Sequence, residues 1–168
     1  MNRGLEQVRD ALADALRAAG LAVCPAFSPG WAKQYSAPVA AVGLRAGESR
    51  SDAFNSYLGR QFDPETQSTH ELYGMRLELT LSLDIYAPPE SGAAGCDQAL
   101  DTLHRVMLEG LPTGLKPAEL RWEETAWDEA TSMFLRRGSL SCSAYFVATA
   151  TEEGAWLTDF ILKGVVTK

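Results

Sequence analysis

An alternating run of apolar and polar residues at 75–86 constrains this fold more than any other feature of the sequence. Its odd positions hold Met75, Leu77, Leu79, Leu81, Leu83 and Ile85. Side chains in a β-strand change face at every residue, so the pattern predicts one long strand with a buried side and a solvent-facing side. A usual strand has about 5 to 6 residues. We therefore expect this strand either to cross a large sheet or to extend past its own domain toward a neighbouring subunit.

Two amphipathic helices are predicted, one on either side of this strand in the sequence. In the first, apolar residues recur at three- and four-residue spacing over 5–19, and Gly20 follows as a C-cap. The second covers 96–109 and closes at Gly110, with Leu108 among polar neighbours on its outer face. Leu108 is therefore a candidate contact residue. The glycine-rich residues 91–95 before this helix read as a turn.

Further strands complete the predicted fold. They are expected at 21–27, 38–44, 120–127, 133–138 and 139–150, followed by an apolar segment at 155–168. The order of elements predicts an α+β fold, a mostly antiparallel β-sheet with the two amphipathic helices packed on one face. A chain of 168 residues fits a single domain.

Residues 45–71 predict a long β-arm or loop insertion in this domain. The segment contains Gly, Ser and Asp breakers but also Phe54, Tyr57, Leu58 and Phe62. Long loops inside a compact domain are uncommon and are usually functional or mobile. We expect an arm or hairpin whose aromatic side chains contact another surface. The alternative is that these aromatics fold back on their own domain.

Charge and cysteine content restrict the possible partners. Fifteen Lys and Arg against twenty-two Asp and Glu give a formal net charge of −7, which repels the phosphate backbone of nucleic acids. The three cysteines form no CxxC pair, so we interpret them as reduced core residues. The N-terminus lacks the apolar core of a signal peptide, and no apolar run is long enough to span a membrane. We expect a protein made and used in a cytoplasm, or in a particle assembled there.

No motif in the sequence predicts a catalytic residue, a cofactor or a metal. The strongest candidate is "RWEETAWDEA", where Glu123, Glu124 and Asp128 lie beside two tryptophans. Paired carboxylates can hydrolyse glycosides, but neighbouring residues of a strand face opposite sides, so Glu123 and Glu124 would not act together without a bulge. We therefore interpret this segment as a hairpin with solvated acids.

The remaining pattern is typical of a protein that associates with others. The even face of the long strand carries Arg76, Glu78 and Asp84, charges that either pair with an identical subunit or meet water. Closed rings of identical subunits need such heterologous surfaces. The candidate interface residues are Phe54, Tyr57, Leu58, Phe62, Arg76, Glu78, Asp84 and Leu108.

Four segments resemble those of small tail proteins of tailed bacteriophages and prophages, in particular the tail-terminator family that includes the lambda-type terminators. They are "GLEQVRDALADALRAAG", "RLELTLSLDIYAP", "CDQALDTLHRVMLEG" and "SLSCSAYFVATA". The resemblance lies in the order of the elements and the general character of their sequences, and no functional position is carried over from the family. The arm at 45–71 and the C-terminal 159–168 exceed a minimal domain of that kind, which leaves tail-tube, neck or baseplate roles open.

The resemblance implies a structural virion component and no enzyme. Such proteins form a homo-oligomeric, hexameric ring that caps the tail tube, stops its polymerisation and joins it to the head connector. Their partners are the tail tube protein and the head-tail connector, and DNA passes through the lumen without specific binding. Assembly would take place in the bacterial host cytoplasm. Two alternatives come from other classes: a small ligand-binding regulatory domain with a deep apolar cavity, and a hydrolase acting through Glu124 or Asp128.

Overall fold

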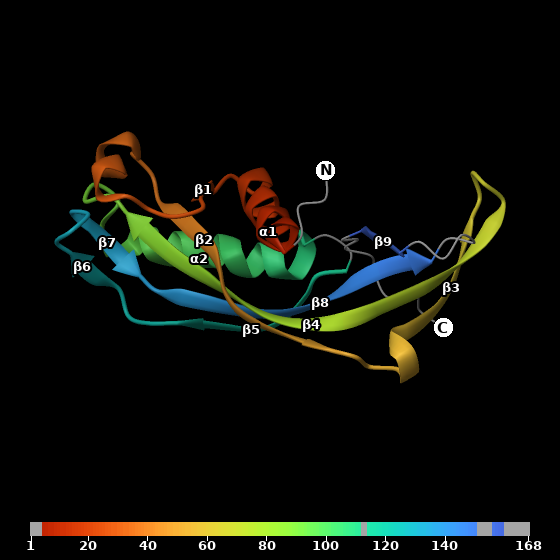
Figure 1. The fold of residues 1–168 in the computed structure, drawn as a ribbon. Coiled ribbons are helices and arrows are strands. Elements are labelled where there is room, and N and C mark those ends of the chain that lie inside the picture. The colour runs from red at the N-terminus through yellow and green to blue at the C-terminus, as the bar shows by residue number, and fades with distance from the viewer. Residues whose placement is uncertain (1–4, 112–113, 151–155, 160–168) are drawn as a thin grey trace.

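The computed structural model describes residues 5–111, 114–150 and 156–159 of the chain (Figure 1). Its helices are α1 (Glu6–Ala18) and α2 (Gly92–Glu109), with short 3₁₀ turns η1 (Pro29–Gln34) and η2 (Phe54–Ser56). Its strands are β1 (Ala22–Cys24), β2 (Val39–Arg50), β3 (Tyr57–Asp63), β4 (Ser68–Ala87), β5 (Lys116–Trp122), β6 (Ala126–Asp128), β7 (Met133–Arg136), β8 (Gly138–Ala150) and β9 (Trp156–Asp159). The predicted α+β class is confirmed.

Strand β4 is the central strand of a single sheet. One edge of β4 pairs first with β3 and then with β2, and its other edge pairs first with β8 and then with β7. All these pairings are antiparallel, whereas β1 joins β2 in parallel. Strands β5 and β9 both pair with β8, at opposite ends of that strand. The long strand predicted at 75–86 is thus real and longer than expected, because it begins at Ser68.

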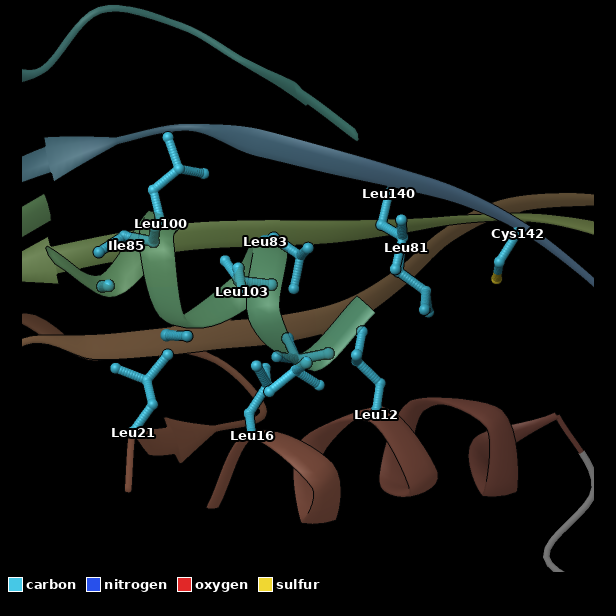
Figure 2. Close-up of a cluster of buried hydrophobic side chains, with 14 of the residues drawn as sticks. Leu12, Leu16, Leu21, Leu81, Leu83, Ile85, Leu100, Leu103, Leu140 and Cys142 are labelled. Atoms are coloured by element: carbon cyan, nitrogen blue, oxygen red, sulfur yellow. The ribbon is translucent and has the colours of Figure 1, made fainter. Parts of the chain in front are cut away.

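Both helices lie on one face of the sheet and bury the core against it (Figures 1 and 2). Leu12 and Leu16 of α1 meet Leu100 and Leu103 of α2 over the odd-numbered leucines of β4. From Leu77 to Ala87 the odd residues of β4 are buried and the even ones are not. Alternation at period two therefore places the apolar side of β4 under the helices, as the sequence predicts.

The buried face changes side toward the β3–β4 turn. There Leu72 and Gly74 are buried, at even positions of β4, while Met75 is exposed. Strand β8 shows the same change, since Ala144 is buried on the helix side and Val147 on the other. The prediction that Met75 belongs to the buried face is wrong, because the helices do not extend over this part of the sheet (Figure 1).

The segment predicted as an arm at 45–71 consists of strands. It contains the outer half of β2, η2, β3 and the first residues of β4. Strands β3 and β4 form an antiparallel hairpin in which Asp63 faces Ser68. The hairpin projects from the part of the sheet that carries the helices (Figure 1). We call η2, β3 and residues 68–75 of β4 the arm.

Two local predictions differ from the structure. Helix α2 begins at Gly92, so the expected turn at 91–95 is its first turn. A Cβ at Gly95 would lie 3.0 Å from Ala87 Cβ and 3.1 Å from Pro38 Cγ, so this glycine serves the close approach of helix and sheet rather than a turn. The strand expected at 120–127 ends at Trp122, and β6 is a separate strand.

The cysteines and the C-terminus can be compared with expectation only in part. Cys24, Cys96 and Cys142 are buried free thiols, as predicted. Burial raises the pKa of Cys142 to about 11, so this thiol stays protonated at neutral pH. Of the apolar segment predicted at 155–168, Trp156–Asp159 forms β9 and the rest lies outside the described residues.

Candidate interaction surface

Aromatic and apolar side chains gather on one face of the arm. The cross-strand register places Tyr57 opposite Tyr73 and Phe62 opposite Thr69, and residues that face each other across a ladder share a side of the sheet. Met75 continues the same odd-numbered face of β4. We define the arm patch as Phe54, Tyr57, Phe62, Tyr73 and Met75.

Two members of the arm patch are unusually exposed. Phe54 is 90% and Phe62 60% accessible to solvent. Large aromatic side chains bury 150–250 Å² when they find a partner, and contiguous apolar exposure marks contact sites. The alternative that these aromatics fold back on their own domain therefore does not hold for Phe54 and Phe62.

Hydrogen bonds fix the turn that presents Phe54. Ser51 Oγ lies 2.9 Å from the carbonyl oxygen of Ala53, to which it donates, and 3.0 Å from Ser56 Oγ. Just before the turn, Tyr145 Oη of β8 donates to the Asp52 carboxylate at 3.1 Å. Because the turn is tied to itself and to the sheet, Phe54 is held outward by a defined structure.

A hollow of about 410 Å³ lies beside Phe54 within this surface. It is lined by Ala53 and by residues of the arm, including Glu71. Tyr57 and Tyr73 meet edge to face with ring centroids 5.5 Å apart, and Tyr73 Oη donates to Glu71 Oε2 at 2.8 Å. The hydrogen bond to Glu71 raises the pKa of Tyr73, so the hydroxyl remains a donor. The hollow thus offers a carboxylate and aromatic rings side by side.

Leu58 does not belong to the arm patch. Its position is a register irregularity between β3 and β4, and its Cδ1 would lie 2.8 Å from a Cβ built on Gly74. Leu58 therefore covers Gly74 on the opposite face of the arm, and it is half-buried there. The structure separates this residue from the three aromatics with which the sequence groups it.

The predicted charges of β4 have partners within the same face. Arg76 Nη2 lies 2.6 Å from Glu78 Oε1, and in the adjacent strand Arg50 Nε lies 2.8 Å from Glu48 Oε1. The register sets Glu48 opposite Glu78 and Arg50 opposite Arg76. The ion pair within each strand therefore offsets the repulsion between the like charges that face each other across the two strands. An interface role of Arg76 and Glu78 stays a prediction.

Asp84 lies in a separate hollow on the face of the sheet opposite the helices. The hollow is about 730 Å³ in volume, and small residues, Ser82, Gly138 and Ser139, form part of its lining. Its charged lining consists of Arg45, Asp84, Arg121, Glu123 and Arg137, and we call it the arginine hollow. Burial raises the pKa of Asp84, against the opposing effects of the Gly138 N–H, Arg137 and Arg45.

Sequence analysis missed the three arginines of this hollow. Arg45 is the extra residue at the register shift between Leu44 and Ala46 of β2, and such a bulge redirects its side chain. Arg137 occupies the connection between β7 and β8. Neither a bulge nor the pairing of strands distant in the chain can be read from local alternation. The only sequence signal for a polar face here is the serine at every second position of 139–143.

Leu108 of α2 is 85% exposed, whereas Leu103 on the buried side of the same helix is 1% exposed. Its outward position agrees with the sequence pattern. The small hollow between the ends of α1 and α2 is lined by Ala15, Ala18, Arg105 and Val106 among others, and Leu108 is not part of it. A contact role of Leu108 therefore stays a prediction.

The acidic segment after β5 is arranged differently from expectation. Glu123 and Glu124 lie outside any strand and line one hollow together with Asp128. The prediction that Glu123 and Glu124 face opposite sides of a strand is wrong, because β5 ends at Trp122. Directly after it, the Glu123 N–H donates to the Arg137 carbonyl oxygen at 2.9 Å. This hollow measures about 160 Å³, below the 300–1,000 Å³ usual for ligand pockets.

Two further properties concern the whole of the described chain. No group of three or more His, Cys, Asp or Glu residues in it is arranged to hold a metal ion. Neither described helix has the length and hydropathy needed to cross a bilayer.

Three kinds of comparison with known proteins were made, and a likeness was found among solved structures. No family model matches the chain, and no curated protein matches it. The chain is similar to the sheath/tube terminator of an extracellular contractile injection system, PVC, whose structure was determined by cryo-EM in the extended state. Sequence identity is 12% and the TM-score 0.46, and the likeness covers 100% of this chain and 62% of that one. The chain thus spans less than two thirds of the terminator's length.

Proposed function

We propose that this protein is a structural component that joins copies of itself into a ring through its arm, as a tail terminator does at the end of a tail tube. The observation that carries the proposal is the exposure of Phe54 and Phe62 on a hairpin that projects beyond the core. An arm held in shape by hydrogen bonds has already lost the conformational freedom that a disordered segment would lose on binding.

The geometry favours head-to-tail contacts between copies. The arm patch lies on the hairpin and the arginine hollow on the other part of the sheet, so a contact made by the arm differs from a contact made by the body. Interfaces between two different surfaces generate rings when the rotation closes. In this proposal the ring is hexameric, caps the tube of a phage-like tail, and contacts the tube protein below and the head connector above.

The proposal is tested by replacing Phe54, Tyr57 and Phe62 together with serine. We expect the wild type to form a single oligomer by light scattering and mass photometry, and the variant to remain a folded monomer by circular dichroism. The control variant Leu5→Ser/Trp31→Ser removes exposed apolar side chains outside the arm and should assemble as the wild type does. An oligomer unchanged by the serine substitutions overturns the proposal.

A second set of measurements separates this function from its rivals. A ligand-binding domain predicts a monomer or dimer with a deep apolar cavity, whereas the arginine hollow is lined by charged residues and serines. A hydrolase predicts glycan turnover that disappears in Glu124→Gln. A monomeric wild type at high micromolar concentration contradicts the ring.

A further inference from the structure

The arginine hollow contains two arginines, Arg45 and Arg137, whose guanidinium groups make no hydrogen bond or ion pair with any described residue. Both lie near Asp84. Arg121 pairs with Glu119 of its own strand at 3.0 Å. A guanidinium carries five N–H donors in a planar fork that matches a carboxylate. Two such forks at one hollow are an arrangement that binds an oxyanion.

The lining of the hollow keeps space open for a ligand group. A Cβ on Gly138 would lie 2.9 Å from the Leu83 carbonyl oxygen, and one on Gly43 would lie 2.8 Å from Ser82 Oγ. Side chains larger than glycine would not fit at these two positions, which lie beside Ser82 and Ser139 of the lining. Ser82 and Ser139 face each other across the ladder. The Ser82 hydroxyl donates to the Gly43 carbonyl oxygen at 3.3 Å, whereas the Ser139 hydroxyl adds a donor to the lining.

The charge balance of the hollow favours a carboxylate over a phosphate chain. Asp84 and Glu123 belong to the same lining, and they would repel a polyanion that the net charge of −7 already disfavours. A carboxylate carries a single negative charge and pairs with one guanidinium fork, so Arg45 and Arg137 can each accept one carboxylate. The ligand expected from this chemistry is an acidic protein segment.

The β3–β4 turn at the tip of the arm has this chemistry. Asp63 and Glu65 bracket Pro64, and the Glu65 N–H donates to Asp63 Oδ1 at 2.9 Å. This hydrogen bond, with those from Thr66, lowers the pKa of Asp63, so the carboxylate is ionised at neutral pH. Glu65 is exposed. The turn thus carries two negative charges on a hydrogen-bonded loop.

The tip cannot reach the hollow of its own chain. Ser68 at the tip and Ser82 at the hollow belong to the same strand, and fourteen residues of extended chain span about 46 Å. Figure 1 shows the β3–β4 turn at one end of the molecule and β6 and β7 at the other. A contact between tip and hollow must therefore join two molecules.

We propose that the acidic β3–β4 turn of one copy docks in the arginine hollow of the next, with Asp63 and Glu65 paired to Arg45 and Arg137. This inference rests on the proposed function and names the contact that gives the ring its direction. It pairs two different surfaces, so each molecule uses its tip on one neighbour and its hollow on the other.

Charge reversal tests the contact. The hollow variant Arg45→Glu/Arg137→Glu and the tip variant Asp63→Lys/Glu65→Lys should each raise the midpoint concentration of dissociation at least about tenfold, because like charges then meet. A chain carrying all four substitutions should assemble again, and so should an equal mixture of the two variants, as an alternating ring. The control Arg17→Glu/Arg105→Glu reverses two exposed arginines on the helices and should change nothing.

A cross-link identifies the positions in contact. The variant Glu65→Cys/Arg137→Cys should form disulfides only between copies under mild oxidation, visible as a ladder on non-reducing gels, while each single variant should not form the ladder. Tip and hollow variants that assemble like the wild type, with no ladder, overturn this inference and leave the ring intact. A ring unaffected by serines in the arm patch overturns the proposed function, and a wild type that never assembles overturns both.

Discussion

One strand, β4, runs through two regions of opposite character. Between Leu77 and Ile85 its odd residues are buried under α1 and α2, whereas in the arm the odd residues Tyr73 and Met75 join an exposed patch. The backbone pairing with β8 runs without a break from Glu71 in the arm to Ser82 in the core region. The difference therefore lies in what covers the sheet. The core region owes its stability to contacts within the chain, and the arm leaves apolar side chains exposed.

The largest effect is expected from Leu81→Ala in the core region. Leu81 is fully buried between the helices and the sheet, so the substitution should lower the free energy of unfolding by about 3 kcal/mol. Urea denaturation followed by circular dichroism measures it. A loss below about 1 kcal/mol would mean that the helices do not pack as described.

Gly74→Ala should act at the junction of the two regions. A Cβ there would collide with the Phe146 carbonyl oxygen of β8 and with Leu58 Cδ1, so we expect a loss of about 2 kcal/mol. Gly30→Ala is the matched control, because nothing lies within 4 Å of a Cβ at that glycine. Equal melting temperatures for the two variants contradict this description of the junction.

Phe54→Ser/Phe62→Ser should barely change the stability of the monomer. Both side chains are largely exposed, and surface substitutions usually change stability by no more than about 0.5 kcal/mol. The urea midpoint, measured at a concentration where the wild type is also monomeric, checks this. A loss comparable to that of Leu81→Ala would show that the arm patch packs on its own chain.

The smallest effect is a pH dependence at Asp84. Burial raises its pKa, and Arg45, Arg137 and Glu123 are the charged side chains that act on it. A carboxyl whose pKa is higher in the folded state loses stabilising free energy as pH rises from about 4, its unfolded value, through the folded value. The stability of Asp84→Asn relative to wild type should therefore increase over that interval. Urea midpoints from pH 3.5 to 7 measure it, and a constant difference would be the opposing result.

Local patterns predicted the core region well. The alternation of β4 and the helical spacing at Leu12 and Leu16 reflect packing against one flat layer, which acts on each residue according to its periodicity alone. The fold class follows from these elements. The buried thiols follow from the absence of paired cysteine spacing.

The arm and the arginine hollow depend on distant parts of the chain. Met75 continues the alternation of β4 in the sequence, yet its exposure is decided by where the helices end. Arg45 is aimed by a bulge that exists only because β2 pairs with β4. Gly95 reads as a turn residue locally and proves to be a point of close contact. Such positions are determined by tertiary pairing, which overrides local preference.

The unbroken ladder between β4 and β8 also has a mechanical meaning. Its register runs without a slip from Glu71 opposite Ala150 to Ser82 opposite Ser139, and its hydrogen bonds lie perpendicular to the strands. A pull along the arm loads these bonds in shear, so that they share the tension and do not open one by one. Tension applied at the hairpin tip is thereby carried as far as Ser82 and Ser139, which line the arginine hollow.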